Sequence, residues 1–394
     1  MGKYKLINNV LGWIVFAIAS TVYLMTMEPT ASFWDCGEFI SSAYKLEVGH
    51  PPGAPFFMLT ANLFTQLASD PSTVAKMVNT MSALFSGLTI LFLFWSITHL
   101  ARNIMVKDGE EASLGQMITV MGSGLVGALA YTFSDTFWFS AVEGEVYAYS
   151  SLFTAVVFWL ILKWEAVADK PHADRWIVLI AYLMGLSIGV HLLNLLCIPA
   201  IVLVYYYKKF PNPTMKGTLV ALLASFAIVA LMMYGVVQGL VEVCGYFELL
   251  FVNVLGMPYN SGVFAYVIIV AGVLIWSIWE TMRDEIHPTR MKIAFILSVV
   301  LIGIPFIGSG YVLAVILTAA LSLYLFKSKK VDIKTLNTIL VCLMVVVVGY
   351  SSYALTLIRA TADTPMNQNA PSDIFTLRTY LAREQYGKTP LCLL

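Results

Sequence analysis

Two carboxylates and one imidazole lie close together in a short stretch near the start of this sequence. Asp35, Glu38 and His50 occur within SFWDCGEFISSAYKLEVGHPPG, which runs from residue 32 to residue 53. A fixed carboxylate can take a proton from an attacking alcohol, and a second polar group can orient that carboxylate or contact the substrate. These residue types therefore point to acid–base chemistry, with Asp35 as the base and Glu38 as its partner. The alternative is a solvated polar linker without a chemical role.

The same stretch is predicted to form a helix that lies flat on a membrane surface. Its polar residues recur at helical spacing and would share one side: Asp35, Glu38, Ser42 and Lys45. Its apolar residues would share the other side and face the lipid: Phe33, Ile40 and Tyr44. The two prolines that follow His50 end the helix and form a sharp turn. That turn could return His50 towards the carboxylates.

Composition indicates an all-α polytopic membrane protein. Hydrophobic residues make up 59% of the chain and charged residues 12%, and the mean hydropathy is +0.81. Soluble domains have about 25% charged residues. The formal net charge is zero and there is no basic tract, so we expect the lipid bilayer and not nucleic acid as a partner.

About eleven transmembrane helices can be drawn from the apolar runs. They cover residues 11–27, 75–100, 117–138, 146–162, 176–190, 192–207, 218–240, 263–279, 293–307, 311–326 and 336–357. The apolar run 55–67 is too short to cross and is predicted to be re-entrant or interfacial. With the first helix uncleaved and the N-terminus inside, most of the 23 Lys and Arg residues fall on the inner side. The acidic loops then lie together on the outer face, which we expect to be the working face.

Four further residues on this outer face are candidates for substrate binding. Glu143 and Glu145 occupy a very short turn where carboxylates are costly unless they are paired or coordinating, although a capping or solvated turn is equally compatible. His191 lies at a helix end, where a structural role is the more common one. Arg359 follows the last span and could bind a phosphate through two hydrogen bonds or anchor the helix in the headgroups.

Acidic side chains and a few cationic ones on the outer face of a helical bundle are compatible with an enzyme that transfers a sugar from a polyprenyl-phosphate carrier. The lipid tail needs a groove between membrane helices, and the leaving phosphate needs a cation or a helix N-terminus but no strict general acid. The acceptor hydroxyl does need a base, and Asp35 suits that role. A transporter or flippase for a lipid-linked sugar is the main alternative, but the span centres are almost free of ionisable residues. A non-catalytic scaffold and a two-carboxylate glycosidase are further alternatives.

Three motifs in this order resemble a known family. They are WDCGEFISSAYKLEVGHPPGAP near residue 35, AVEGEVYAYSSLF at 141–153 and GVHLLNLLCIP at 189–199. They are similar to bacterial membrane proteins, common in the Bacteroidota, that are related to protein O-mannosyltransferases and include a human relative. The resemblance implies a GT-C-type glycosyltransferase in the bacterial inner membrane with a periplasmic active face. It also implies a polyprenyl-phosphate sugar donor, with mannose as the expected sugar, and Ser or Thr acceptors on exported proteins. The transfer is expected to invert the configuration of the anomeric carbon.

By this resemblance, Asp35 and Glu38 correspond to the acidic pair of the first outer loop, and Asp35 takes the role of catalytic base. The other matched positions, His50, Glu143, Glu145 and His191, receive no specific role. We expect no obligate metal, although Asp35, Glu38 and His50 could hold a divalent ion.

The C-terminal part departs from the family pattern. Residues 1–358 are predicted to form the transmembrane glycosyltransferase domain, and residues 359–394 the start of a truncated extracytoplasmic region. Family members usually continue into a long soluble region, and the final LCLL suggests a truncated product. A disulfide between Cys36 and Cys244 is a minor possibility, because both predicted loops face the oxidising side.

Overall fold

The computed structural model describes residues 2–387 except 108, 308–310 and 329–330, and these described residues contain helices and no β-strand. The chain divides into two compact units, one of residues 1–49 and 54–213, the other of residues 50–53 and 214–394. The predicted all-helical class is therefore confirmed. The predicted domain boundary after residue 358 stays a prediction, and residues 388–394, including LCLL, lie outside the described residues.

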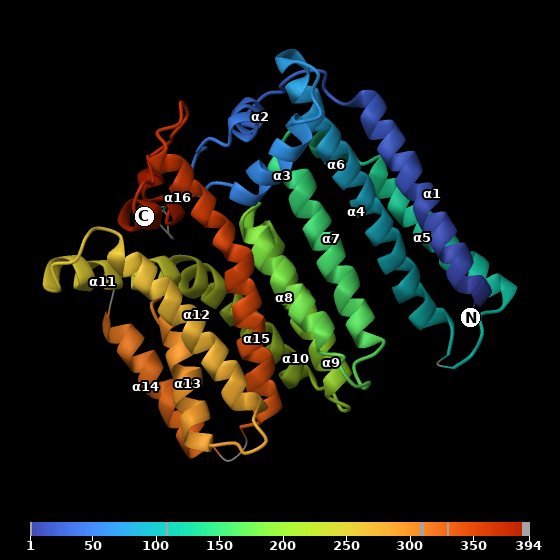
Figure 1. The fold of residues 1–394 in the computed structure, drawn as a ribbon. Helices are drawn as coiled ribbons and strands as arrows, with labels where there is room; N and C mark the ends of the chain where they lie inside the picture. The colour runs from blue at the N-terminus through green and yellow to red at the C-terminus, as the bar shows by residue number, and fades with distance from the viewer. Residues whose placement is uncertain (1, 108, 308–310, 329–330, 388–394) are drawn as a thin grey trace, which may run out of the picture. The chain divides into compact units, whose positions relative to one another are not determined.

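The first unit is built around the long helix α4. Its α-helices are α1 (Gly2–Thr26), α2 (Cys36–Lys45), α3 (Pro55–Thr65), α4 (Val74–Met105), α5 (Leu114–Thr132), α6 (Asp135–Ala141), α7 (Val146–Glu165), α8 (Arg175–Ile188) and α9 (Ile198–Lys209). Short 3₁₀ turns precede α4 at Pro71–Thr73 and α9 at Leu192–Cys197. Helices α1, α5 and α7 all pack on α4 and run alongside it (Figure 1).

Small residues allow the helices of this first unit to approach closely. A Cβ added to Gly87 of α4 would lie 2.0 Å from the Ser20 hydroxyl oxygen of α1. A Cβ on Gly124 of α5 would lie 2.5 Å from a methyl carbon of Thr98 in α4. Helix contacts in membranes depend on such small residues because apolar side chains gain little by leaving lipid for protein.

The second unit is also helical. It contains α10 (Met215–Ala230), α11 (Leu240–Leu249), α12 (Ser261–Met282), α13 (Pro288–Leu301), α14 (Tyr311–Lys327), α15 (Ile333–Tyr350), α16 (Ala354–Thr361) and α17 (Ile374–Leu381). Two π-helical segments, Leu231–Gly239 and Leu250–Val254, flank α11, and 3₁₀ turns occur at Ser351–Tyr353 and Glu384–Tyr386. The buried Glu248 accepts backbone hydrogen bonds from Asn260 and Val263 at 2.6 and 3.1 Å, so it caps the start of α12.

Among the described residues, eight helices are long and apolar enough to cross a membrane. They are Gly2–Thr26, Pro71–Met105, Leu114–Thr132, Val146–Glu165, Leu192–Lys209, Met215–Val254, Ser261–Met282 and Ile333–Thr361. The chain is thus a multi-pass membrane protein, whereas the count of eleven is not confirmed. The other three predicted spans coincide with the shorter helices α8, α13 and α14. Segment 55–67 contains the 11-residue α3, which is too short to cross, as predicted.

Two glycines in the second unit bring their backbones into close contact. Gly303 has a φ of +92°, and a Cβ added to it would lie 2.1 Å from the Gly239 carbonyl carbon. We predict that Gly303→Ala lowers stability by about 2–4 kcal/mol, because it combines a strained backbone with a clash against backbone atoms. Thermal unfolding in detergent, followed by size-exclusion chromatography, measures this effect. Gly272→Ala is the matched control, since no atom lies within 4 Å of that Cβ, and equal midpoints for the two variants would contradict the prediction.

Candidate active site

Asp35 occupies the N-cap position of α2 but its side chain makes no capping hydrogen bond. An N-cap aspartate normally accepts a hydrogen bond from the first turn of its helix. Trp34, just before it, has a φ of +60°, which is unusual for a bulky residue and turns the chain sharply into the helix. The Asp35 side chain is exposed, so a substrate can reach this carboxylate.

The end of α2 returns the chain towards the start of the same helix. Leu46 adopts the left-handed conformation that ends the helix, and the following segment 47–49 is buried. Gly49 passes so near Glu38 that a Cβ would lie 2.6 Å from the Glu38 Oε1 atom. After His50, a turn is closed by a hydrogen bond of 2.9 Å from the Gly53 N–H to the His50 carbonyl.

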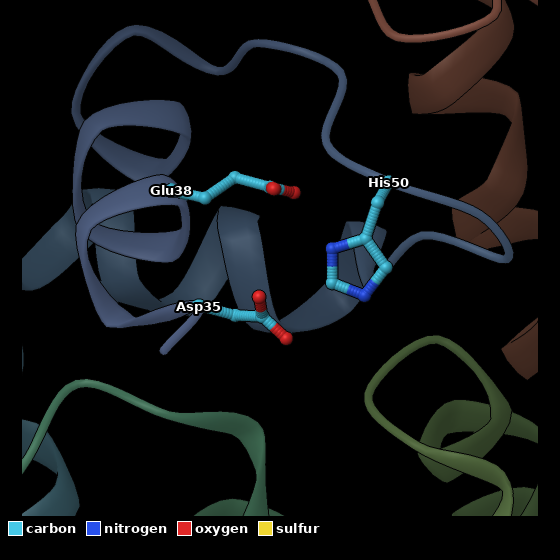
Figure 2. Close-up of side chains that lie close together, drawn as sticks. All are labelled: Asp35, Glu38 and His50. Atoms are coloured by element: carbon cyan, nitrogen blue, oxygen red, sulfur yellow. The ribbon is translucent and has the colours of Figure 1, made fainter. Parts of the chain in front are cut away.

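This path of the chain brings Asp35, Glu38 and His50 close together. Potential ligand atoms of Asp35, Glu38 and His50 all lie within 4.8 Å of one another. In Figure 2, the His50 ring and the two carboxylates point towards a common space. The prediction that the Pro-Pro turn returns His50 to the carboxylates is met by this geometry. Two carboxylates and an imidazole are also donors that a divalent cation accepts.

The predicted faces of α2 are partly wrong. Ser42, placed on the polar stripe, and Ile40, placed on the lipid side, are both buried. Phe33 and Tyr44, also placed on the lipid side, are exposed, so their contact with lipid stays a prediction. The buried apolar face consists of Phe39, Ile40 and Ala43, and it packs into a protein core with α3. The reason is that α3 supplies a partner for this face, including an edge-to-face contact between Phe39 and Phe57 with centroids 5.4 Å apart. The apolar side of α2 therefore covers protein.

Glu143 contacts residues before and after Asp35 at the start of α2. Its side chain is 4% exposed and accepts hydrogen bonds from the side chains of Ser32 and Cys36. Burial raises the pKa of the Glu143 carboxyl, and the two hydrogen bonds act in the opposite direction. Burial, and then the nearby carboxylates, raise the pKa of the Cys36 thiol, so this thiol is a neutral donor.

Two further contacts fix the loop that leads into α2. The Asn79 side chain of α4 donates to the carbonyls of Glu28 and Thr30 at 2.7 and 3.0 Å. The backbone N–H of Glu28 donates to the Val142 carbonyl, next to Glu143, at 3.0 Å. Sequence reasoning missed Ser32, Cys36 and Asn79, because small uncharged side chains give no signal until their partners are known.

The third motif joins the same cluster through its backbone. The Gly189 carbonyl accepts hydrogen bonds from the N–H groups of Phe56 and Phe57 at 2.7 and 3.2 Å, in the first turn of α3. The His191 ring contacts Tyr147 edge to face with centroids 5.5 Å apart, and its Nδ1 accepts from the Leu193 N–H at 3.1 Å. Residues of all three motifs, among them Phe39, Tyr149 and Val190, pack in one hydrophobic core cluster of the first unit.

The remaining candidate residues have different surroundings. Glu145 is 6% exposed, and its carboxylate caps its own helix by accepting from the Val146 N–H at 2.8 Å. Arg359 lies in α16 of the second unit, so its role at a phosphate stays a prediction. Cys36 and Cys244 are both free and buried, so the structure does not form the disulfide considered from the sequence.

Comparison with known proteins gives similarity over the part of the chain that contains this cluster. Residues 35–214 match the family model described as the N-terminal domain of protein O-mannosyl-transferase TMEM260. Protein O-mannosyl-transferase TMEM260 of Mus musculus is 28% identical over 174 residues, which cover 44% of this chain and 22% of the mouse protein. The Dictyostelium discoideum protein of the same name is 26% identical over 187 residues, 46% of this chain and 21% of its own length.

The chain thus spans about a fifth of the length of the curated relatives it matches. No solved structure matches it. The matched region begins at Asp35, the second residue of the first motif, includes the rest of the three motifs, and covers most of the first unit.

Proposed function

We propose, from the premise that residues 35–214 are related to protein O-mannosyl-transferases, that this chain is a glycosyltransferase of GT-C type that modifies proteins. The donor is a polyprenyl-phosphate sugar, with mannose as the proposed sugar, and the acceptors are Ser and Thr hydroxyls of exported proteins. The reaction takes place on the periplasmic face of a bacterial inner membrane. The exposed Asp35 carboxylate, grouped with Glu38 and His50, is the observation that carries this proposal.

In the proposed reaction, an Asp35 oxygen takes the proton of the acceptor hydroxyl. The hydroxyl oxygen then forms a bond to the anomeric carbon, while the bond from that carbon to the phosphate oxygen breaks. The phosphate leaves with the bonding electrons, so a single displacement inverts the configuration. Because Asp35 makes no capping hydrogen bond, its lone pairs are not already used by the helix.

Neighbouring groups have supporting roles in this proposal. Glu38 and His50 contact the acceptor or the leaving phosphate, since their polar atoms share one space with Asp35 (Figure 2). Glu143 acts as a positioning residue, because it contacts Ser32 and Cys36 and is itself shielded from substrate. His191 shapes the site through Tyr147. Arg359, in the second unit, is proposed to bind a phosphate, and this role requires its own mutational test.

The proposal is tested with purified full-length chain, synthetic polyprenyl-phosphate mannose and a peptide rich in Ser and Thr. We expect mannose to become covalently attached to peptide hydroxyls, with inversion at the anomeric carbon. Peptide mutated from Ser and Thr to Ala serves as the control. Donor hydrolysis without peptide modification would support a glycosidase and contradict the proposal.

Chelation tests the expectation that no metal is obligatory. The donors Asp35, Glu38 and His50 are mixed oxygen and nitrogen ligands, and mannosyl transfer with a phosphate leaving group can proceed without a Lewis acid. We predict that EDTA treatment changes the transfer rate by less than about twofold. Removal of a metal ion that neutralises the charge of the leaving phosphate would lower the rate by more than this. Loss of transfer that added Mn²⁺ or Mg²⁺ restores would show that a metal ion is required and would contradict this prediction.

A further inference from the structure

A polar cavity lies at the end of the first unit's helices that is opposite to Asp35. It has a volume of about 640 Å³ and is formed where α1 and α5 begin and where α4 and α7 end. Its lining comes from residues near the start of α1 and from Trp95, Arg102 and Lys163. Asp35 follows the other end of α1, whose 25 residues span about 37 Å at 1.5 Å per residue. This cavity is therefore separate from the candidate active site.

Charged and amphipathic side chains give the cavity the character of an anion site. Four of its lining residues are cationic: Lys3, Lys5, Arg102 and Lys163. Two carboxylates, Glu110 and Glu111, also line it, which leaves an excess of positive charge. His99 is also in the lining, but its Nε2 atom lies 3.6 Å from the Glu165 carboxylate, so we do not count it among the cations of the cavity.

Aromatic rings hold two of the cations at the cavity. The Arg102 guanidinium lies over the Tyr4 ring at 5.4 Å, and the Lys163 ammonium lies over the Trp159 ring at 4.8 Å. Asn8 also lines the cavity, and its buried Oδ1 atom has no hydrogen-bond partner among the described residues. A ligand with both a phosphate and a hydroxyl would satisfy the cations and this acceptor together.

The position of the cavity favours a lipid as the source of that phosphate. The four helices around it are each among those long and apolar enough to cross a membrane. Their shared end is therefore at the level of the lipid headgroups, and the excess of Lys and Arg places it on the cytoplasmic side. Basic pockets between transmembrane helices on that side bind anionic headgroups. We propose that this cavity binds the phosphate of an anionic glycerophospholipid, such as phosphatidylglycerol, on the face opposite the proposed sugar transfer.

Native mass spectrometry of the delipidated full chain tests this proposal. We expect phosphatidylglycerol to be retained in preference to phosphatidylcholine, which carries no net charge. The variant Lys5→Gln, Arg102→Gln and Lys163→Gln should weaken retention by ~100-fold, because each cation near a membrane surface contributes severalfold to the binding of anionic lipid. The matched control replaces the exposed lysines Lys107, Lys170 and Lys216, which are on the same predicted side but do not line the cavity, by Gln.

Equal retention by the cavity variant and the control variant would overturn the proposal, as would equal binding of the two lipids by the wild type. Displacement of the lipid by millimolar inorganic phosphate would identify a site for a soluble anion and overturn the lipid assignment. Because the triple variant could misfold, a second measurement uses the wild type alone. Photoactivatable phosphatidylglycerol should cross-link to residues 3–9, 95–117 and 163–166, and cross-links confined to other segments would contradict the proposal.

Discussion

Asp35→Asn is expected to abolish measurable mannosyl transfer, with turnover lowered by about 10²–10⁴-fold. Asparagine has nearly the shape of aspartate but cannot take the proton of the acceptor hydroxyl. Binding of the donor should stay within about twofold, because the proton is transferred only in the reaction step. Single-turnover transfer from labelled polyprenyl-phosphate mannose and equilibrium binding of the same donor measure the two quantities separately.

The matched control for this variant is Asp135→Asn. Asp135 is an exposed aspartate in the first turn of α6, on the same predicted outer face, and it is not part of the cluster around Asp35. We expect the control to transfer at the wild-type rate within about twofold. Unchanged turnover in Asp35→Asn would remove this carboxylate from the mechanism.

Glu143→Gln is expected to lower turnover by ~10- to 100-fold with little change in the KM for the donor. The reason is positional: Glu143 accepts hydrogen bonds from Ser32 and Cys36, which flank Asp35, and glutamine replaces one of the two acceptor oxygens with an NH₂ donor. A small displacement of a reacting group costs rates of this size. Combining Glu143→Gln with Asp35→Asn should add almost nothing to the loss from Asp35→Asn alone, because both changes act on the same proton transfer.

Two variants separate this positioning role from a general loss of structure. Glu145→Gln alters the adjacent buried glutamate, whose carboxylate caps α7, so it should reduce stability by about 1 kcal/mol and change turnover less. Cys36→Ser keeps a hydrogen-bond donor towards Glu143 and should retain most of the activity. Equal turnover losses in Glu143→Gln and Glu145→Gln would contradict a specific role for Glu143.

The sequence was sufficient to predict the class of fold and the grouping around Asp35. Apolar runs gave the positions of the helices because a bilayer demands about 20 apolar residues for each crossing. The two prolines after His50 indicated a sharp return, and the three side chains indeed share one space. Helices α8, α13 and α14 show where this reasoning weakens, since runs of 14 to 17 residues do not by themselves distinguish a crossing helix from a shorter one.

Contacts between distant segments could not be predicted from local patterns. Helical spacing placed Ser42 on an exposed stripe, but the face of α2 that is buried depends on α3. The same limit applies to Glu143, whose neighbours Ser32 and Cys36 lie more than 100 residues earlier. A short turn with two glutamates indicates a costly environment for charge, but it does not identify which glutamate caps its own helix and which one supports Asp35.

Covalent transfer in the absence of a bilayer distinguishes a glycosyltransferase from a carrier of lipid-linked sugar most directly. The purified chain in detergent is incubated with labelled polyprenyl-phosphate mannose and an acceptor peptide, and mass spectrometry locates the label. We predict mannose on Ser or Thr of the peptide and its loss with Asp35→Asn. Movement of intact donor across proteoliposomes, with no labelled peptide in detergent or in vesicles, would contradict transfer and favour a flippase.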